Sequence, residues 1–115
     1  MARLLEIRTY RLKPGTTDAF HDAVHTKAVP MLLAKGMDVV AYGRSDHEEE
    51  TYFLVRSYAS REALEKEQAD FYGTDDWKLG PKSTLVDLIQ TYLNTLIWAS
   101  ELSVESMREL NKPAM

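Results

Sequence analysis

One alternating stretch near the N-terminus constrains the fold of this chain more than any other. The residues LLEIRTYRLKPG, from Leu4 to Gly15, alternate in side-chain character and end at a Pro-Gly pair. A period of two predicts a β-strand, and the Pro-Gly pair predicts the turn that ends it. One face carries Leu5, Ile7 and Thr9, and the other carries Glu6, Arg8 and Tyr10. The alternation does not decide which face meets the helices and which meets a partner sheet.

The next segment has the spacing of an amphipathic helix. Thr16 or Thr17 can cap its start, and Lys35-Gly36 supplies a basic last turn and a glycine stop. Pro30 interrupts the pattern because it lacks an N–H group and crowds the carbonyl four residues earlier. We therefore predict a bend between Thr26 and Pro30, or an early end to the regular helix.

Two β-rich segments follow and form a predicted hairpin. They span Met37 to Ser45 and Thr51 to Tyr58, and the charged residues 46–50 between them predict a mobile tip at the surface. On the second of these strands Arg56 and Tyr58 share one face. The charged and aromatic pattern of the first strand therefore recurs.

The C-terminal half predicts three more helices, a short helical turn and a fourth strand. A helix from Arg61 to about Phe71 is followed by DFYGTDDWKLGP, in which Thr74 can cap a short helical turn and Pro81 suits a new helix start. Alternation from Leu93 to Trp98 predicts the strand, and a helix continuing to Ser100 is the alternative. Residues 103–110 predict a terminal helix, and residues 111–115 a frayed end.

This order predicts an α+β fold of the ferredoxin-like, split βαβ type, with a four-stranded antiparallel sheet in a single domain over residues 1–115. Tyrosines are spread over the strands, so we expect that one sheet face is covered by helices and the other by a second copy of the chain. The sequence therefore predicts a homodimer.

Composition narrows the classes of partner and compartment. The net charge is −4, so neither nucleic acid nor an anionic membrane is an expected partner. The chain has no cysteine, which excludes disulfides and thiolate chemistry. No apolar run approaches the length of a membrane span, and the N-terminus lacks a signal-peptide pattern, so a cytoplasmic location is expected.

The two polar strand faces carry the main candidate site. Arg8, Tyr10, Arg56 and Tyr58 together offer guanidinium and phenol groups that can bind an anionic or polar ligand. The alternative interpretation is an ion-pair network of Arg8 and Arg56 with Glu6, because buried charges need partners whether or not a ligand binds.

Histidines and aromatic residues supply further candidates. His21 and His25 lie four residues apart on the predicted helix, but two imidazoles do not complete a metal site, so no metal is predicted. His21 alone can serve as a general base. Tyr72 and Trp77, with Phe71, can form the aromatic wall of a pocket or a hydrophobic clamp between helices.

Three segments of the sequence stand out together: the pattern E-x-R-x-Y-x-L-x-P-G at residues 6–15, the hairpin DVVAYGRS…TYFLVRSYAS and the segment DFYGTDDWKLGP. In combination they resemble bacterial members of the NIPSNAP family. The resemblance spans about residues 4–99 and implies a dimeric α+β barrel, in which two sheets pack together with the helices outside. The family has no general established reaction, and its superfamily includes cofactor-independent monooxygenases and haem-degrading enzymes. The latter use an Asn on the first strand, which this chain lacks.

Two hypotheses about function follow. In the first, the protein binds a small organic molecule and acts, without a cofactor, as an oxygenase or isomerase on an aromatic or polyketide-like compound. Tyr10, Arg8 and Arg56 would then orient an enolate or carboxylate, with His21 as the base. In the second, the protein is a non-catalytic interaction or ligand-carrier module, and the polar strand row is structural.

Overall fold

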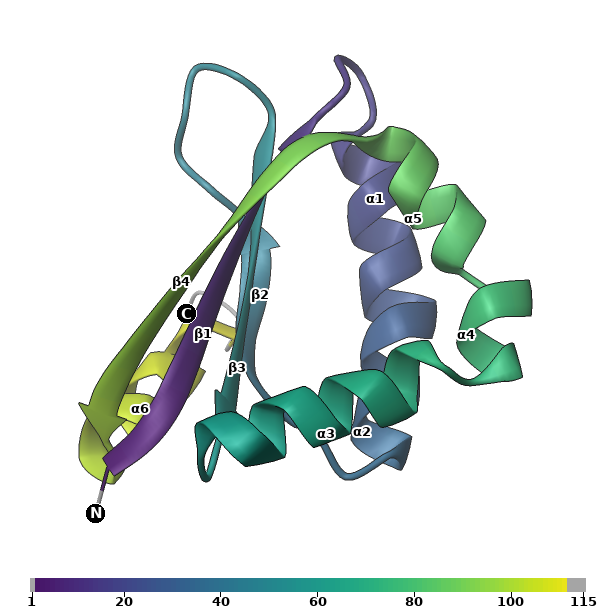
Figure 1. Cartoon of the computed structure of the whole chain (residues 1–115). Coiled ribbons are helices and arrows are strands. Elements are labelled where there is room, and N and C mark those ends of the chain that lie inside the picture. The colour runs from purple at the N-terminus through teal and green to yellow at the C-terminus, as the bar shows by residue number, and fades with distance from the viewer. Residues whose placement is uncertain (1, 112–115) are drawn as a thin grey trace.

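A computed structural model describes residues 2–111 and shows a four-stranded antiparallel sheet with helices on both faces (Figure 1). The strands are β1 (Ala2–Leu12), β2 (Asp38–Arg44), β3 (Thr51–Tyr58) and β4 (Ile89–Ser100), in the spatial order β2-β3-β1-β4. This is the predicted split βαβ order. The predicted fourth strand is confirmed, and the alternative of a helix continuing to Ser100 is wrong.

The first helical segment runs in three parts, α1 (Thr17–Ala23), a π-helical turn η1 (Val24–Ala28) and α2 (Val29–Ala34). The wider turn coincides with the place where the ring of Pro30 would crowd the carbonyl of Thr26 in a regular α-helix. The chain therefore accommodates Pro30 by a π turn. The irregularity falls where we predicted it, and the helix continues beyond it.

The acidic tip between β2 and β3 has a structural role at the start of α1. The Thr16 side chain makes no capping hydrogen bond there. The Glu50 carboxylate instead accepts hydrogen bonds from the backbone N–H groups of Gly15 and Thr17 and from the Thr17 hydroxyl. The Thr17 hydroxyl contributes most to lowering the pKa of Glu50. At Glu50, the tip that we predicted to be mobile is therefore held to the start of α1.

Three helices follow β3, and two of them have the predicted caps. They are α3 (Arg61–Tyr72), α4 (Asp75–Leu79) and α5 (Lys82–Leu88). The Ser60 hydroxyl accepts a hydrogen bond from the backbone of Ala63, and Thr74 accepts one from the backbone of Trp77 at 3.2 Å. Gly80 separates α4 from α5, and a Cβ atom there would lie 2.4 Å from the Asp76 carbonyl oxygen. The tight connection therefore requires glycine.

The C-terminal helix lies on the opposite face of the sheet from α1 to α5 (Figure 1). It comprises α6 (Glu101–Met107) and a 3-10 turn η2 (Arg108–Asn111). Val104 is buried in a cluster with Leu5 and Val55. The Asn111 amide donates to the Val40 carbonyl at 2.9 Å and accepts from the backbone of Tyr42. The predicted fraying is therefore wrong at Asn111, and residues 112–115 lie outside the described part of the chain.

An ion pair anchors η2 to β2. The Arg108 guanidinium donates to both carboxylate oxygens of Asp38, at 2.8 and 2.9 Å. Partial burial alone would raise the pKa of Asp38, but hydrogen bonds from Arg108 and Ser57 lower it below its ordinary value. The charged form of Asp38 is therefore the form that the fold stabilises.

The packing shows which face of the first strand meets the helices. Tyr10 and Leu12 belong to a buried cluster with residues of the first helical segment, whereas Leu5 and Ile7 pack on the α6 side. The row Glu6, Arg8 and Tyr10 therefore points toward α1 to α5. Among the described residues, no helix is long and apolar enough to cross a membrane.

Candidate ligand cavity

A cavity of about 440 Å³ lies between the sheet and the layer of helices α1 to α5. Most of its wall is apolar and includes Phe20, Val24, Ala28, Leu54, Phe71, Trp77 and Leu85. Polar groups are fewer, and they include Arg8, Tyr10, Gln68, Tyr72 and Lys82. An apolar body with a few polar groups is the usual composition of a site for a small organic molecule.

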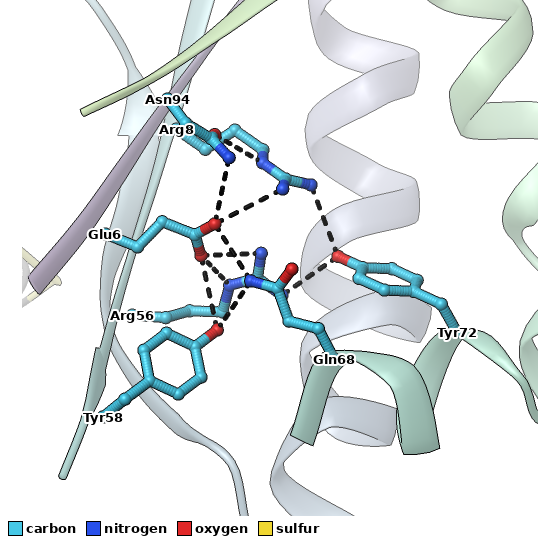
Figure 2. A network of polar contacts seen from close by, with 7 residues as sticks. All are labelled: Glu6, Arg8, Arg56, Tyr58, Gln68, Tyr72 and Asn94. Carbon is cyan, nitrogen blue, oxygen red and sulfur yellow. Dashed lines mark hydrogen bonds and ion pairs between the residues drawn. The ribbon is translucent and has the colours of Figure 1, made fainter. Parts of the chain in front are cut away.

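The carboxylate of Glu6 is the centre of the polar network beside this cavity (Figure 2). Glu6 is 1% exposed, and its neighbours come from β1, β3, β4 and α3. Hydrogen bonds reach its two oxygens from Arg8, Arg56, Tyr58, Gln68 and Asn94. Since a carboxylate has about four lone-pair sites, both oxygens are fully occupied. Glu6 is therefore a structural anion and not an available base.

Arg56 is the main partner of Glu6 and is completely buried. Its Nε donates to Glu6 Oε1 at 2.9 Å, and its Nη1 donates to the Tyr72 hydroxyl at 3.0 Å. Nη2 lies 2.8 Å from the same Oε1 but outside hydrogen-bond geometry, so this contact is an ion pair only. Burial alone would lower the pKa of Arg56, but the Tyr72 oxygen and the Glu6 carboxylate together raise it.

Arg8 lies at the boundary between this network and the cavity. Its Nε donates to Asn94 Oδ1 at 2.8 Å, and its Nη2 reaches Glu6 Oε2 at 3.3 Å. A longer contact of 3.5 Å joins Nη1 to the Tyr72 hydroxyl. The Arg8 side chain is 14% exposed and lines the cavity, and its guanidinium carbon lies 5.1 Å from the centre of the Tyr92 ring. Arg8 is therefore the network cation that a ligand can reach.

Tyr10 and Tyr58 occupy different positions relative to the cavity. Tyr10 lines it, and burial raises the pKa of its phenol to about 12, with Arg8 opposing this effect. Tyr10 therefore stays protonated near neutral pH and can donate a hydrogen bond. The Tyr58 hydroxyl instead donates to Glu6 at 3.3 Å, and neither Tyr58 nor Arg56 is among the residues that line the cavity.

His21 is connected to the cavity through Tyr52. His21 Nδ1 lies 2.6 Å from the hydroxyl of Tyr52, which lines the cavity, whereas His21 itself does not. The His21 and His25 rings are stacked, with centroids 5.7 Å apart. Burial lowers the pKa of His21, and the charges of Arg44 and His25 lower it further. The role of His21 as a base stays a prediction, and any such role involves Tyr52.

The aromatic residues at the end of α3 and in α4 combine both predicted roles. Phe71, Tyr72 and Trp77 all line the cavity, and their ring centroids lie 5.1 to 5.4 Å from one another. The same cluster packs α4 against the end of α3. It therefore forms a wall of the cavity and a clamp between helices at once. Among the described residues, no group of three or more potential metal ligands lies close together.

Gln68 and Asn94 also belong to the site, and neither was among the predicted site residues. Gln68 lies between buried Leu64 and Phe71 on one face of α3, and its amide donates to Glu6 Oε2 at 2.9 Å. Asn94 pairs with Arg8 across β1 and β4. The sequence feature that could have identified Gln68 is its place, as a polar residue, on the apolar face of the predicted helix. The feature that could have identified Asn94 is its place in the alternating pattern of the fourth strand.

The fold and the cavity define a ferredoxin-like α+β domain with a ligand-sized pocket under its helices. The family model NIPSNAP matches residues 5–102, so the chain belongs to the NIPSNAP family. No curated protein is detectably similar to it in sequence.

Solved structures share this fold at low sequence identity. A NIPSNAP family protein of unknown function from Agrobacterium tumefaciens strain C58 is 22% identical, with 85% of this chain and 88% of that chain covered and a TM-score of 0.78. A dimeric ferredoxin-like protein from an uncultured marine organism is 14% identical, with 88% and 90% covered and a TM-score of 0.65.

A third similar structure comes from Caulobacter crescentus CB15, and its protein is provisionally named an antibiotic biosynthesis monooxygenase. It is 22% identical, with 87% of this chain and 92% of that chain covered and a TM-score of 0.66. At these identities, the three structures support the fold and leave the chemistry of this chain open.

Proposed function

We propose that the cavity between the sheet and helices α1 to α5 binds a small organic molecule with an aromatic or otherwise apolar body. The observation that carries this proposal is the shape and lining of the space. Its volume of about 440 Å³ lies in the range of roughly 300–1,000 Å³ typical of small-molecule sites. Aromatic and aliphatic side chains form the wall, and Arg8 provides a charged group at one place in it.

Binding can be tested by filling the cavity. Ala28 lines it from η1, and Ala28→Phe would place a ring in the space. Ala34→Phe makes the same substitution at an exposed position of α2 and is the matched control. With 2-naphthol as the probe, calorimetry should show saturable binding to the wild type and to Ala34→Phe, and lost binding to Ala28→Phe. Equal binding to both variants, or none to the wild type, would contradict the proposal.

A cofactor-independent oxygenase or isomerase reaction on an aromatic or polyketide-like compound is the catalytic form of this proposal. Arg8 and Tyr10 both face the cavity, where they can orient an enolate or carboxylate. The fold shared with a provisionally named monooxygenase adds analogy. Substrate-dependent oxygen uptake with 1,2-dihydroxynaphthalene should fall in Arg8→Ala and in His21→Ala. Unchanged uptake in both variants would remove these residues from the mechanism.

A non-catalytic ligand carrier is the second candidate, and one observation favours it. The described residues that line the cavity include no carboxylate and no histidine. Proton abstraction by His21 would therefore have to pass through the Tyr52 hydroxyl, and burial raises the pKa of Tyr52. Ligand binding without any oxygen uptake or product would support this candidate.

We also propose that two copies associate through the sheet face that carries α6. Leu93 and Ile97 on β4 are 70% and 44% exposed, and they pair with Thr9 and Leu5 on this face. Similarity to a dimeric ferredoxin-like protein supports the proposal. Sedimentation should give a dimer at micromolar concentration, and Leu93→Glu should weaken it. A wild type that sediments as a single chain would contradict it.

A further inference from the structure

The charges beside the cavity do not balance within the described residues. The network contains one carboxylate, Glu6, and two guanidinium groups, Arg8 and Arg56, so it carries one surplus positive charge (Figure 2). A buried or partly buried charge is stable only with a partner of opposite sign or with water. The question is which of the two cations is the surplus one.

The distances assign the surplus to Arg8. Arg56 occupies Oε1 of Glu6 with two nitrogens, at 2.9 and 2.8 Å, and is fully buried. Gln68 and Asn94 already donate to Oε2, at 2.9 and 3.2 Å, and Arg8 has only the longest contact to that oxygen, at 3.3 Å. Arg8 also lines the cavity, whereas Arg56 does not. The charge of Arg8 is therefore the one left for a ligand.

The hydroxyl of Tyr72 supplies a hydrogen-bond donor next to Arg8. Its oxygen accepts from Arg56 at 3.0 Å and from Arg8 at 3.5 Å. A phenol hydroxyl can accept and donate at the same time, and it carries one proton to donate. No residue in the described part of the chain accepts a hydrogen bond from Tyr72, and Tyr72 lines the cavity. Its proton is therefore free to be donated to a group in the cavity.

We infer that this end of the cavity is a receptor for one singly charged oxyanion, a carboxylate or an enolate, held between the Arg8 guanidinium and the Tyr72 hydroxyl. The inference rests on the proposed function and specifies the ligand class, namely an apolar molecule that carries one oxyanion. Arg56 and Glu6 do not contact this ligand. They are positioning residues that hold Arg8 and Tyr72 in place.

A matched pair of probes separates charge recognition from binding of the apolar body. 2-Naphthoate and 2-naphthamide have the same ring and nearly the same shape, and only the first is an anion. The amide has one acceptor oxygen and an NH₂ group that would face the donors of Arg8 and Tyr72. Because charge-assisted hydrogen bonds are the stronger ones, we expect the wild type to bind the carboxylate at least about tenfold more tightly by calorimetry.

Variants then locate the source of this preference. Arg8→Met should bring the two affinities to within about twofold, and Tyr72→Phe should weaken naphthoate by about three- to tenfold with little change for naphthamide. Arg8→Lys should keep part of the preference. Arg11→Met is the matched control, because Arg11 lies on the same strand but does not line the cavity. Thermal melts identify any variant that fails to fold.

The outcomes distinguish this inference from the proposed function. Tight binding of both probes by the wild type with equal affinity would overturn the oxyanion receptor and leave the proposed function intact. Loss of the preference in Lys82→Met but not in Arg8→Met would also overturn it, since the charge would then be assigned to the wrong residue. Binding of neither probe would contradict the proposed function and this inference together.

Discussion

Replacing Glu6 with glutamine tests whether its carboxylate holds the polar network together. Glutamine has nearly the same shape, so the substitution leaves no cavity and changes only charge and hydrogen-bonding capacity. The substitution removes the counter-charge of Arg56, which is completely buried. It also replaces one carboxylate oxygen, which accepts hydrogen bonds, with an NH₂ group that would face the donors Arg56 or Gln68. Breaking a buried ion pair by removal of one partner costs about 3–5 kcal/mol.

Urea and thermal unfolding measure this loss. For a chain of this size each kcal/mol corresponds to roughly 4 °C in Tm, so Glu6→Gln should lower Tm by about 12–20 °C. Glu49→Gln is the matched control, because Glu49 pairs with Arg11 at the surface and both side chains are at least half exposed. It should change the free energy of unfolding by less than about 1 kcal/mol.

The size of the loss in unfolding free energy shows whether the Glu6 carboxylate holds the network together. If Glu6→Gln costs no more than Glu49→Gln, the carboxylate does not hold the network, and the assignment of Arg56 to Glu6 is wrong. Arg8→Met should cost clearly less than Glu6→Gln, because Glu6 keeps Arg56 and three neutral donors. An equal cost for the two variants would contradict the view that Arg8 is the surplus cation.

Three further predictions concern pH and the backbone. The folded state lowers the pKa of Asp38 from its ordinary value of 3.8, so the stability it contributes is present above that value and is lost as the pH falls below it. The free energy of unfolding of Arg108→Met should therefore fall less steeply than that of the wild type as the pH decreases below 3.8. Identical pH dependence for the two proteins would contradict this. The folded state also lowers the pKa of His21 from 6.5, so NMR should show a titration midpoint below 6.5, and a midpoint above it would be inconsistent with the burial of the ring. Gly80→Ala should destabilise the fold by about 1–3 kcal/mol in urea unfolding, because its Cβ would overlap a backbone oxygen. Gly43→Ala should cost less, because the nearest atom to a Cβ at that position lies 3.5 Å away. A larger cost for Gly43→Ala than for Gly80→Ala would contradict the geometry.

Strand alternation predicts the sheet well because successive side chains of a strand point to opposite faces of the sheet, and the two faces of this sheet meet different surroundings. The Thr51–Tyr58 strand and the caps at Ser60 and Thr74 depend on local chemistry, and the structure has them where the sequence places them. The row Glu6, Arg8 and Tyr10 was also identified from alternation alone. Its orientation toward the helices was not, because both faces of this strand are buried in some layer and alternation is symmetric between them.

Contacts that join distant parts of the chain are the ones that the sequence leaves undetermined. Gln68 lies 62 residues from Glu6, and Asn94 lies 88 residues from it, so no local pattern links them to that carboxylate. The capping of α1 by Glu50 is of the same kind, since an exposed run of acids gives no sign of its partner. His21 lies near the cavity, but the position of Tyr52 between them depends on how β3 packs against α1.

A crystal structure of the protein with 2-naphthoate bound would test the central claim most directly. We predict the naphthalene ring within the cavity beside Trp77 and Leu85, and the carboxylate within hydrogen-bond distance of the Arg8 guanidinium and the Tyr72 hydroxyl. Naphthoate bound on the outer face of the sheet near Ile97, with the cavity closed by its own side chains, would contradict it.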